Sequence, residues 1–341
     1  MFSWAKCSLV HIRTEPELQR RYAPPIVDGS SSLDRIRCYK QRATLHTMPS
    51  LLHDPRFVIA KQGAISFDKF PTRLPGKPEK DELKAIVAEE REKIIKLQEK
   101  LYVDDRYALL LLFQAMDASG KDSCAKHVLS GVDPVGVRTW SFKAPTAEEH
   151  AHDFLWRHAC ALPVRGAIGI HNRSHYEEVL VVRVHPEYLL GQKIPGIASV
   201  ADVGPALWKK RFESIRNFEA HLAAEGIILM KFHLRMGREA QKERFMERLD
   251  DPLKNWKFSV DDIHERARWD DYMKAYEEAI GATAAPHAPW YLVPADEQWE
   301  TRATVAQLVR EQLEAMDLQA PVLSAKAKAG LVEARKLLAA E

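Results

Sequence analysis

Hydrophobic and polar positions alternate with clear periodicity from about residue 79 onward. Apolar residues recur at three- and four-residue intervals from Glu79 to about Leu101 among many Lys and Glu residues, which predicts an amphipathic helix. The run YALLLLFQAMD at 107–117 is dense in apolar side chains, short, and bounded by a Gly-bearing turn. Such a run is typical of a buried central strand in a parallel sheet.

The alternation continues toward the carboxyl end of the chain. Helices are predicted after this strand at 124–133, at 146–161 and at 236–251; strands are predicted at 137–145, from Gly166 and at 226–235. Strands and helices of this length in alternation predict an α/β fold, a parallel sheet with helices on both faces.

Three segments depart from this alternation. Residues 1–47 mix Pro, Arg, Ser and Gly without periodicity, which predicts a poorly ordered N-terminal extension and makes Met48 a candidate start. An irregular arm is expected at 49–78, at the start of the main domain at 48–310. Pro and Gly residues interrupt the pattern at about 177–210, which suits a lid that excludes water. Residues 311–341 are rich in Ala and Leu and are predicted to form a helical tail.

Composition narrows the function classes. The 341 residues carry a formal net charge of +2, so affinity for a polyanion must come from a local basic groove, and nothing global suggests nucleic acid. No stretch approaches the roughly 20 apolar residues that span a bilayer. The four Cys residues lack CxxC spacing, which favours reduced thiols in a cytoplasm.

A candidate phosphate-binding loop lies between the strand at 107–117 and the helix that follows. In the segment AMDASGKD at 115–122, successive backbone N–H groups can point at phosphate oxygens, the helix N-terminus adds partial positive charge, and Lys121 adds a full one. The match to GxxxxGK[ST] is incomplete, because Ala115 replaces the first Gly and Asp122 the hydroxyl residue. A Gly-containing turn with an exposed Lys remains the structural alternative.

Asp117 is an unusual residue inside such a loop. A carboxylate beside phosphates repels them unless it holds a cation, and Mg²⁺ takes one or two carboxylates together with phosphate oxygens. Asp117 is therefore the candidate metal ligand, with a turn Asp that bonds its own backbone as the alternative. A second segment, GIHNRSHYE at 169–177, places Asn172 and Arg173 at the carboxyl end of a strand, where α/β sheets bind ligands. The Arg173 guanidinium could reach transferring phosphoryl oxygens.

Several long motifs together resemble the type-2 polyphosphate kinase family. They occur in the same order over roughly residues 50–310 and include AMDASGKDS, GIHNRSHYEEVLVVRVH, EAQKERFMERLDDPLKNWKFS, DDIHERARWDDYMKAYEEAI and APWYLVPAD. The resemblance implies a P-loop kinase-like (thymidylate-kinase-like) fold with a helical lid, and Mg²⁺ as cofactor. In its Asn172, which stands where an Asp would be expected, the chain resembles the class III branch of the family. That branch is associated with accepting both AMP and ADP.

The resemblance also implies roles for individual residues. Asp117, Lys121 and Arg173 match catalytic positions, and the expected nucleotide- or phosphate-binding residues are Ala118, Ser119, Gly120, Asp122, Lys143, Asn172, Arg183, Lys209 and Arg211. MGREAQ at 236–241 and Glu297-Gln298 depart from the family pattern, which bears on substrate preference more than on the reaction class.

The expected function is reversible phosphoryl transfer from inorganic polyphosphate to ADP or AMP, with ATP as the product from ADP. We expect a cytoplasmic homo-oligomer, dimer or tetramer, that binds neither nucleic acid nor membrane. An ATP-dependent nucleotide kinase, a P-loop ATPase coupled to motion and a non-catalytic nucleotide-binding protein are the alternatives. The incomplete loop motif and the many separated cations between Lys121 and Arg238 favour the polyphosphate reaction.

Overall fold

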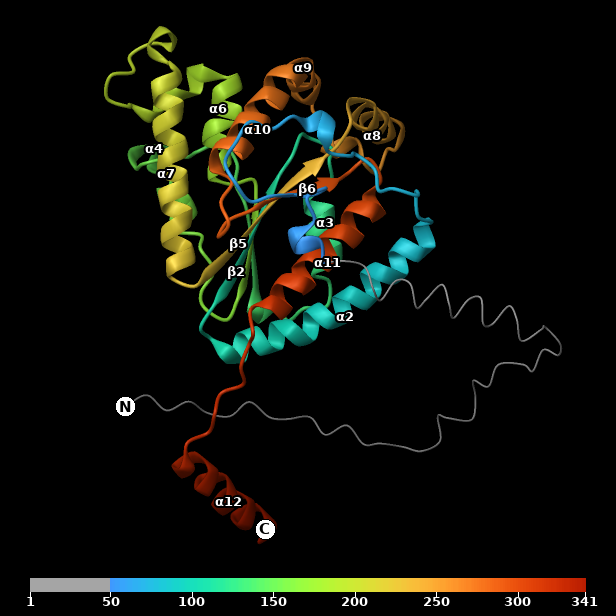
Figure 1. Cartoon of the computed structure of the whole chain (residues 1–341), viewed down its shortest axis with the longest axis vertical. Coiled ribbons are helices and arrows are strands. Elements are labelled where there is room, and N and C mark those ends of the chain that lie inside the picture. Colours follow the sequence, from blue (N-terminus) through green and yellow to red (C-terminus); the bar gives the residue numbers. More distant parts are fainter. Residues whose placement is uncertain (1–49) are drawn as a thin grey trace, which may run out of the picture. The chain divides into compact units, whose positions relative to one another are not determined.

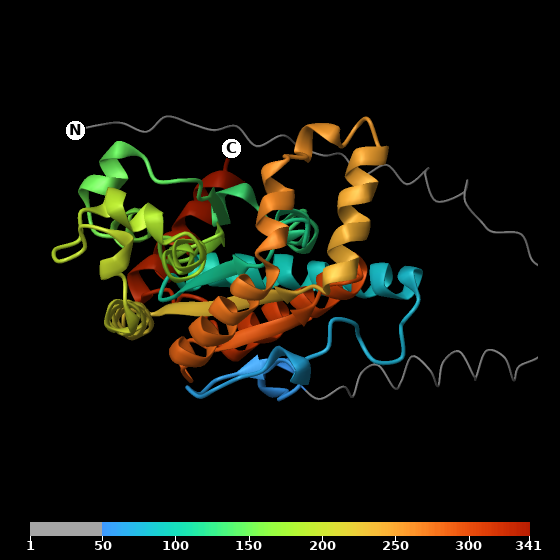
Figure 2. The same cartoon turned by 90° about the horizontal axis from the view of Figure 1, so that it is seen from above.

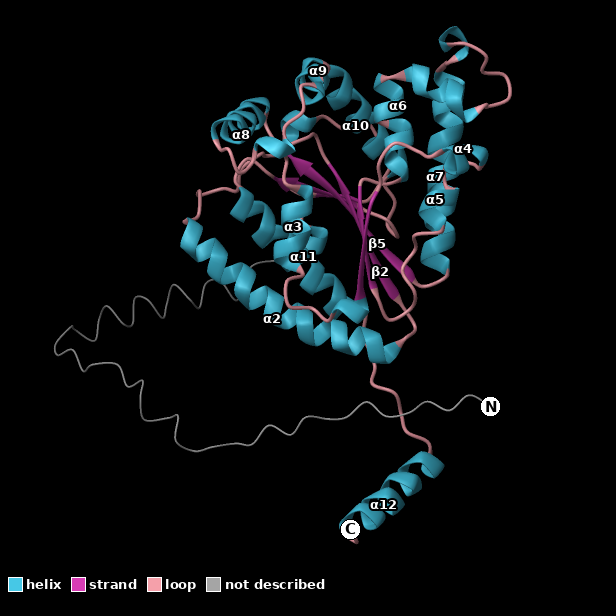
Figure 3. Cartoon of the chain, turned by 180° about the vertical axis from the view of Figure 1, so that it is seen from behind, coloured by secondary structure: helices cyan, strands magenta, loops and turns pink. Residues whose placement is uncertain are grey.

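The computed structural model describes residues 50–341, which build a six-stranded sheet flanked by helices (Figures 1 and 3). The predicted extension at 1–47 lies outside the described residues. The strand order is β1-β6-β5-β2-β4-β3, and all neighbouring pairs are parallel except β1 with β6. The strands are β1 (Val58–Ile59), β2 (Ala108–Gln114), β3 (Val137–Ser141), β4 (Ile168–Asn172), β5 (Ile227–Arg235) and β6 (Trp290–Pro294).

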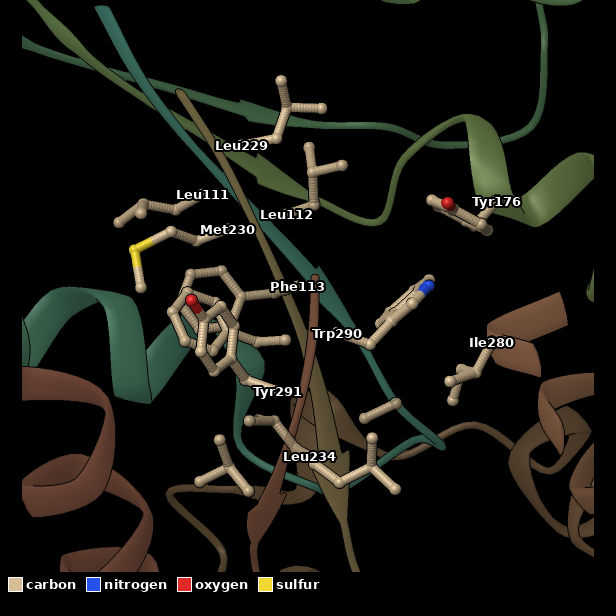
Figure 4. Close-up of a cluster of buried hydrophobic side chains, with 14 of the residues drawn as sticks. Leu111, Leu112, Phe113, Tyr176, Leu229, Met230, Leu234, Ile280, Trp290 and Tyr291 are labelled. Atoms are coloured by element: carbon tan, nitrogen blue, oxygen red, sulfur yellow. The ribbon is translucent and has the colours of Figure 1, made fainter. Parts of the chain in front are cut away.

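The core lies on both faces of the central strands (Figure 4). Every residue of β2 and of β6 is buried, as expected where helices cover both faces of a parallel strand. The rings of Phe113 on β2 and Phe232 on β5 stack with centroids 5.0 Å apart. Because the neighbouring strands run parallel in register, their carboxyl ends meet at one edge of the sheet.

Two groups of helices flank the sheet. One group, whose members pack against one another, contains α2 (Lys80–Asp104), α3 (Lys121–Val128) and α11 (Gln298–Ala315). The other contains α6 (Val181–Val184), α7 (Pro205–Ala224) and α10 (Trp269–Thr283), together with the 3₁₀ helix η5 (His175–Val179). Helices α8 (Arg238–Asp250) and α9 (Asp261–Ala267) form an excursion beyond the carboxyl end of β5, and Figure 2 shows it from above.

The predicted α/β fold of the P-loop kinase-like type is confirmed, with differences in detail. The helix predicted at 146–161 is wrong: α4 (Ala147–Ala151) and α5 (Trp156–Ala159) are separate, because the Asp153 carboxylate accepts a hydrogen bond from the Leu155 backbone N–H and turns the chain. The strand predicted at 137–145 ends at Ser141. Strands β1 and β6 were not predicted, and β1 lies within the arm expected to be irregular.

The tail forms α12 (Ala325–Ala339), a helix with every side chain at least partly exposed and none buried. Within residues 50–341, no helix combines the length and the apolar character needed to cross a bilayer.

One group of charged residues lies deep in the core. The Lys231 ammonium donates to Glu219 Oε2 at 2.7 Å, to the Tyr176 hydroxyl at 3.0 Å and to the Thr283 carbonyl at 3.0 Å. Burial lowers the pKa of Lys231. Burial alone would raise the pKa of Glu219, but the neighbouring ammonium holds that pKa below its ordinary value. The cluster ties β5, α7, η5 and α10 together, with each charged group supplied with hydrogen-bond partners.

Candidate active site

A tight loop at 115–120 joins β2 to α3 at the carboxyl edge of the sheet. Ala118 and Gly120 have φ values of 64° and 92°, so both adopt the left-handed conformation that tight loops require. Gly120 is the N-cap of α3, and its carbonyl accepts from the Cys124 backbone N–H at 2.8 Å. The loop therefore presents backbone N–H groups and the positive end of α3 to the same space.

Lys121 is the first residue of α3, and its side chain folds back over this loop. Its ammonium donates to the Ala115 carbonyl at 2.8 Å and to the Met116 carbonyl at 3.2 Å. Burial lowers the pKa of Lys121, and the nearby Asp117 carboxylate opposes that shift. The ammonium is thus held by neutral carbonyls, with no carboxylate within ion-pair distance among the described residues.

Two polar contacts join the loop and the first turn of α3 to the end of β4. Arg173 Nη2 lies 3.2 Å from Asp117 Oδ1, and both side chains are partly exposed. The Asn172 side-chain amide donates to the Asp122 carboxylate. Arg173 itself has a φ of 63°, and its backbone N–H donates to the Phe113 carbonyl at 3.1 Å. The predicted residues of the two segments therefore meet at one point, as their places on neighbouring parallel strands require.

Glu177 on η5 adds a carboxylate that was not predicted as a site residue. Burial raises the pKa of Glu177, and the positive charges of Arg173 and Lys121 oppose that shift. Its position four residues after Arg173, within the NRSHYE motif, is the sequence signal that could have identified it.

Helix α8 contacts the phosphate loop, and α9 contacts α8. The Gln241 amide donates to the Asp117 carbonyl at 3.0 Å, and Arg244 Nη1 donates to the Ala118 carbonyl at 3.0 Å. On α9, Asp262 Oδ2 lies 3.5 Å from Arg248 Nη1. Burial raises the pKa of Asp262, and the Asp117 carboxylate adds to that shift. We call residues 238–267 the cap, because they carry these groups to the loop.

The oxygen ligands at this point fit Mg²⁺. The Asp117 carboxylate is partly exposed, and Asn172 Oδ1 is buried without a hydrogen-bond partner among the described residues. Within residues 50–341, no cluster of three or more His, Cys, Asp or Glu residues could enclose a metal ion alone. Mg²⁺ suits such a site, because it retains waters and takes one or two carboxylates with phosphate oxygens. The Ser119 hydroxyl is also buried without a partner, at the wall of the same loop.

Four predicted phosphate-binding residues lie apart from this cluster. Lys143 and Lys209 are exposed. Arg183 pairs with Glu278 at 2.5 Å and lies over the Trp208 ring. Arg211 is only 4% exposed. Its guanidinium donates to the Glu178 carbonyl at 2.8 Å and to the Glu178 carboxylate at 3.1 Å, so it is held inside the fold.

A parallel α/β sheet with a lysine-bearing loop between its central strand and a helix defines a P-loop phosphotransferase. Comparison with known proteins identifies the family within this class. The model of the Polyphosphate kinase 2 family matches residues 77–321. The chain belongs to this family.

Individual relatives belong to the same class of enzyme. The chain is 42% identical over 284 residues to an ADP-polyphosphate phosphotransferase of Rhodopseudomonas palustris, spanning 83% of this chain and 97% of that protein. It is 43% identical over 226 residues to an AMP/ADP-polyphosphate phosphotransferase of Meiothermus ruber, spanning 66% and 79%. The crystal structure of polyphosphate kinase 2 from Arthrobacter aurescens is similar with a TM-score of 0.71 and 37% identity, covering 80% of this chain and 94% of that one.

Proposed function

We propose that this polyphosphate kinase transfers a phosphoryl group reversibly between inorganic polyphosphate and ADP or AMP, with Mg²⁺ as cofactor. The observation that carries the proposal is the convergence of Lys121, Arg173 and Asp117 on one loop at the positive end of α3. Phosphoryl transfer needs mainly positioning and charge neutralisation, which this arrangement supplies. The names of the relatives support the two acceptors.

Each residue has a distinct task in this proposal. The Lys121 ammonium exchanges its two carbonyl partners for oxygens of the transferring phosphoryl group. Arg173 leaves Asp117 and presents its planar fork to the same oxygens, which stabilises charge as the bond breaks. Loop N–H groups from Ala118 to Gly120 hold the neighbouring phosphate. Asp117 and Asn172 would hold Mg²⁺, which when bound neutralises phosphate charge.

The cap at 238–267 serves as the water-excluding element in this proposal. Its Gln241 and Arg244 bond the loop directly, whereas the segment predicted as a lid, 177–210, forms η5, α6, η6 (Pro186–Gln192) and η7 (Val200–Asp202) and leads into α7. The prediction of a lid at 177–210 stays a prediction. Exclusion of water matters because hydrolysis would waste the phosphate donor.

The reaction is tested with purified protein, Mg²⁺ and long-chain polyphosphate, with ADP and AMP supplied separately. We expect ATP from ADP and ADP from AMP, measured by ³¹P NMR, with loss of both in Lys121→Ala. Lys126→Ala is the matched control, because Lys126 is exposed on the same helix. Phosphoryl transfer from ATP to AMP without any use of polyphosphate would instead establish the ATP-dependent kinase. Nucleotide binding without turnover would establish the non-catalytic alternative.

A cytoplasmic location and self-association remain parts of this proposal. Cys160 is a free, exposed thiol and Cys124 a free, buried one, which suits a reducing compartment.

A further inference from the structure

The outer surface of the cap is apolar and acidic. Helical spacing places Glu239, Glu243 and Met246 on the side of α8 away from Gln241 and Arg244, which contact the phosphate loop. Large apolar side chains are exposed along the cap, by between 43% and 85%: Met246, Leu249, Leu253, Trp256, Val260 and Ile263. A shallow hollow on α8 is lined by four acidic residues and one basic residue beside Met246: Glu239, Glu243, Glu247, Asp250 and Lys242. Exposed apolar clusters of this kind mark interaction surfaces.

Helix α12 has the complementary character. Leu331, Ala334 and Leu338 follow each other at helical spacing and form an apolar stripe, with Leu331 and Leu338 exposed by 60% and 70%. Lys328 and Arg335 flank that stripe, and the helix as a whole carries four basic residues against one acidic residue. The match to the family model ends at residue 321, before α12 begins. The helix is therefore an addition to the matched domain.

The attachment of α12 limits what it can reach. The Gln319 backbone N–H donates to Asp104 Oδ2 at 2.5 Å, which fixes the chain near the amino end of β2. The cap follows the carboxyl end of β5, at the opposite edge of the sheet. Seven strand residues span about 20 Å, and the five residues 320–324 extend by at most about 18 Å. Within one chain, the linker alone, even when fully extended, does not bring the start of α12 to the cap.

We propose that α12 of one copy of this chain docks on the outer surface of the cap of a second copy, and that the exchange is reciprocal. The apolar stripe covers Met246 and Leu249, while Lys328 and Arg335 face the acidic row on α8. In a dimer with two-fold symmetry, each cap is covered by the α12 helix of the other copy, so the assembly is closed. Since the inner side of α8 bonds the phosphate loop, docking holds each cap against its own active site.

The first experiment measures the mass of the full-length chain by sedimentation velocity over a range of concentrations. Wild type is expected to be at least a dimer, and Leu331→Glu/Leu338→Glu to weaken association by tenfold or more. The matched control is Ala329→Glu/Val332→Glu, two new charges on the opposite side of the same helix, which should leave association unchanged. A monomeric wild type, or equal loss in both double variants, overturns the proposal. Removal of residues 325–341 gives the same readout without added charges.

A charge exchange then identifies the docking surface. Glu243→Lys/Glu247→Lys on α8 should dissociate the dimer, and adding Lys328→Glu/Arg335→Glu to the same chain should restore it. A cooperative thermal melting curve shows that the combined variant is folded. If this folded variant does not associate, α12 docks on another surface and the inference is overturned. The readout is mass, so it is independent of whether the proposed reaction is correct.

Discussion

Two lysines of this fold, the buried Lys231 and the partly buried Lys121, differ in what surrounds their ammonium groups. Lys231 has a carboxylate, a hydroxyl and a carbonyl within 3.0 Å of its ammonium, all from the protein core. Among the described residues, the Lys121 ammonium donates to two backbone carbonyls, and the Asp117 carboxylate, which acts on it through charge, is paired with Arg173. Burial lowers the pKa of both lysines. The fold neutralises the charge of Lys231, whereas in the proposed function the charge of Lys121 is neutralised by phosphate.

This difference separates structural from functional charge. Breaking a buried ion pair costs stability, because the remaining partner keeps its desolvation penalty. Removing a charge that the fold leaves unneutralised should cost catalysis and little stability. The following predictions test that separation, beginning with the largest effect.

Lys231→Met should lower the free energy of unfolding by about 3–5 kcal/mol, because it leaves the Glu219 carboxylate buried without its counter-ion. Urea unfolding followed by circular dichroism measures the loss. Lys231→Met/Glu219→Leu should recover much of the lost stability, because the Glu219 carboxylate is removed together with the Lys231 ammonium. A double variant as unstable as the single one would show that packing, and not the ion pair, is responsible.

Lys121→Ala should raise the barrier to phosphoryl transfer by about 3–4 kcal/mol, a loss of several hundredfold in rate. The urea midpoint should stay close to that of wild type. Steady-state assays with polyphosphate and ADP measure the rate. Activity within tenfold of wild type would remove Lys121 from the catalytic group.

Arg211→Ala should resemble the Lys231 change, with a loss of about 1.5–3 kcal/mol in stability, because its hydrogen bonds to Glu178 are buried and charge-assisted. Lys209→Ala, two positions away and exposed, should change stability by less than about 0.5 kcal/mol. Only Lys209→Ala is expected to reduce the salt dependence of the Michaelis constant for polyphosphate, through its screened charge. If the Arg211→Ala protein is as stable as wild type and has a higher Michaelis constant for polyphosphate, Arg211 binds polyphosphate as the sequence predicted.

Glu177→Gln should have a smaller effect on stability than Arg211→Ala, within about 1 kcal/mol, and the effect should depend on pH. Burial raises the pKa of Glu177 above 4.5, so the folded state binds its proton more tightly than the unfolded state. The contribution of this carboxyl to stability is therefore fully present below pH 4.5 and is lost as pH rises through the folded pKa. The variant should thus gain melting temperature relative to wild type between pH 4 and pH 7. If the difference in melting temperature between the variant and wild type is the same at every pH from 4 to 7, the raised pKa of Glu177 is contradicted.

The sequence predicted the parts of the site whose signal is local. A buried strand, a Gly turn and Lys121 at a helix start are adjacent in the chain, and Arg173 follows a strand that the pattern also predicts. Gln241 and Arg244 contact the loop from more than 120 residues away, so no spacing could indicate them. Arg211 has the sequence appearance of a surface cation, and only the fold brings Glu178 to it.

Strand β6 was missed for a related reason. The segment WYLVP at 290–294 is short, aromatic and ends in Pro, and no local alternation marks it. Its place beside β5 comes from long-range pairing of Phe232 with Tyr291. Buried strands of parallel sheets give a weak periodic signal, because both of their faces are covered.

Burial raises the pKa of Asp262 on the cap, and repulsion from the Asp117 carboxylate of the loop adds to that shift. Without a cation between them, this repulsion works against the closed position of the cap. Mg²⁺ held at Asp117 would offset this repulsion by neutralising the loop carboxylate. In the proposed mechanism, closure of the cap over the loop is therefore favoured when substrate and metal arrive together, and water is excluded at the moment when the phosphate donor is in place.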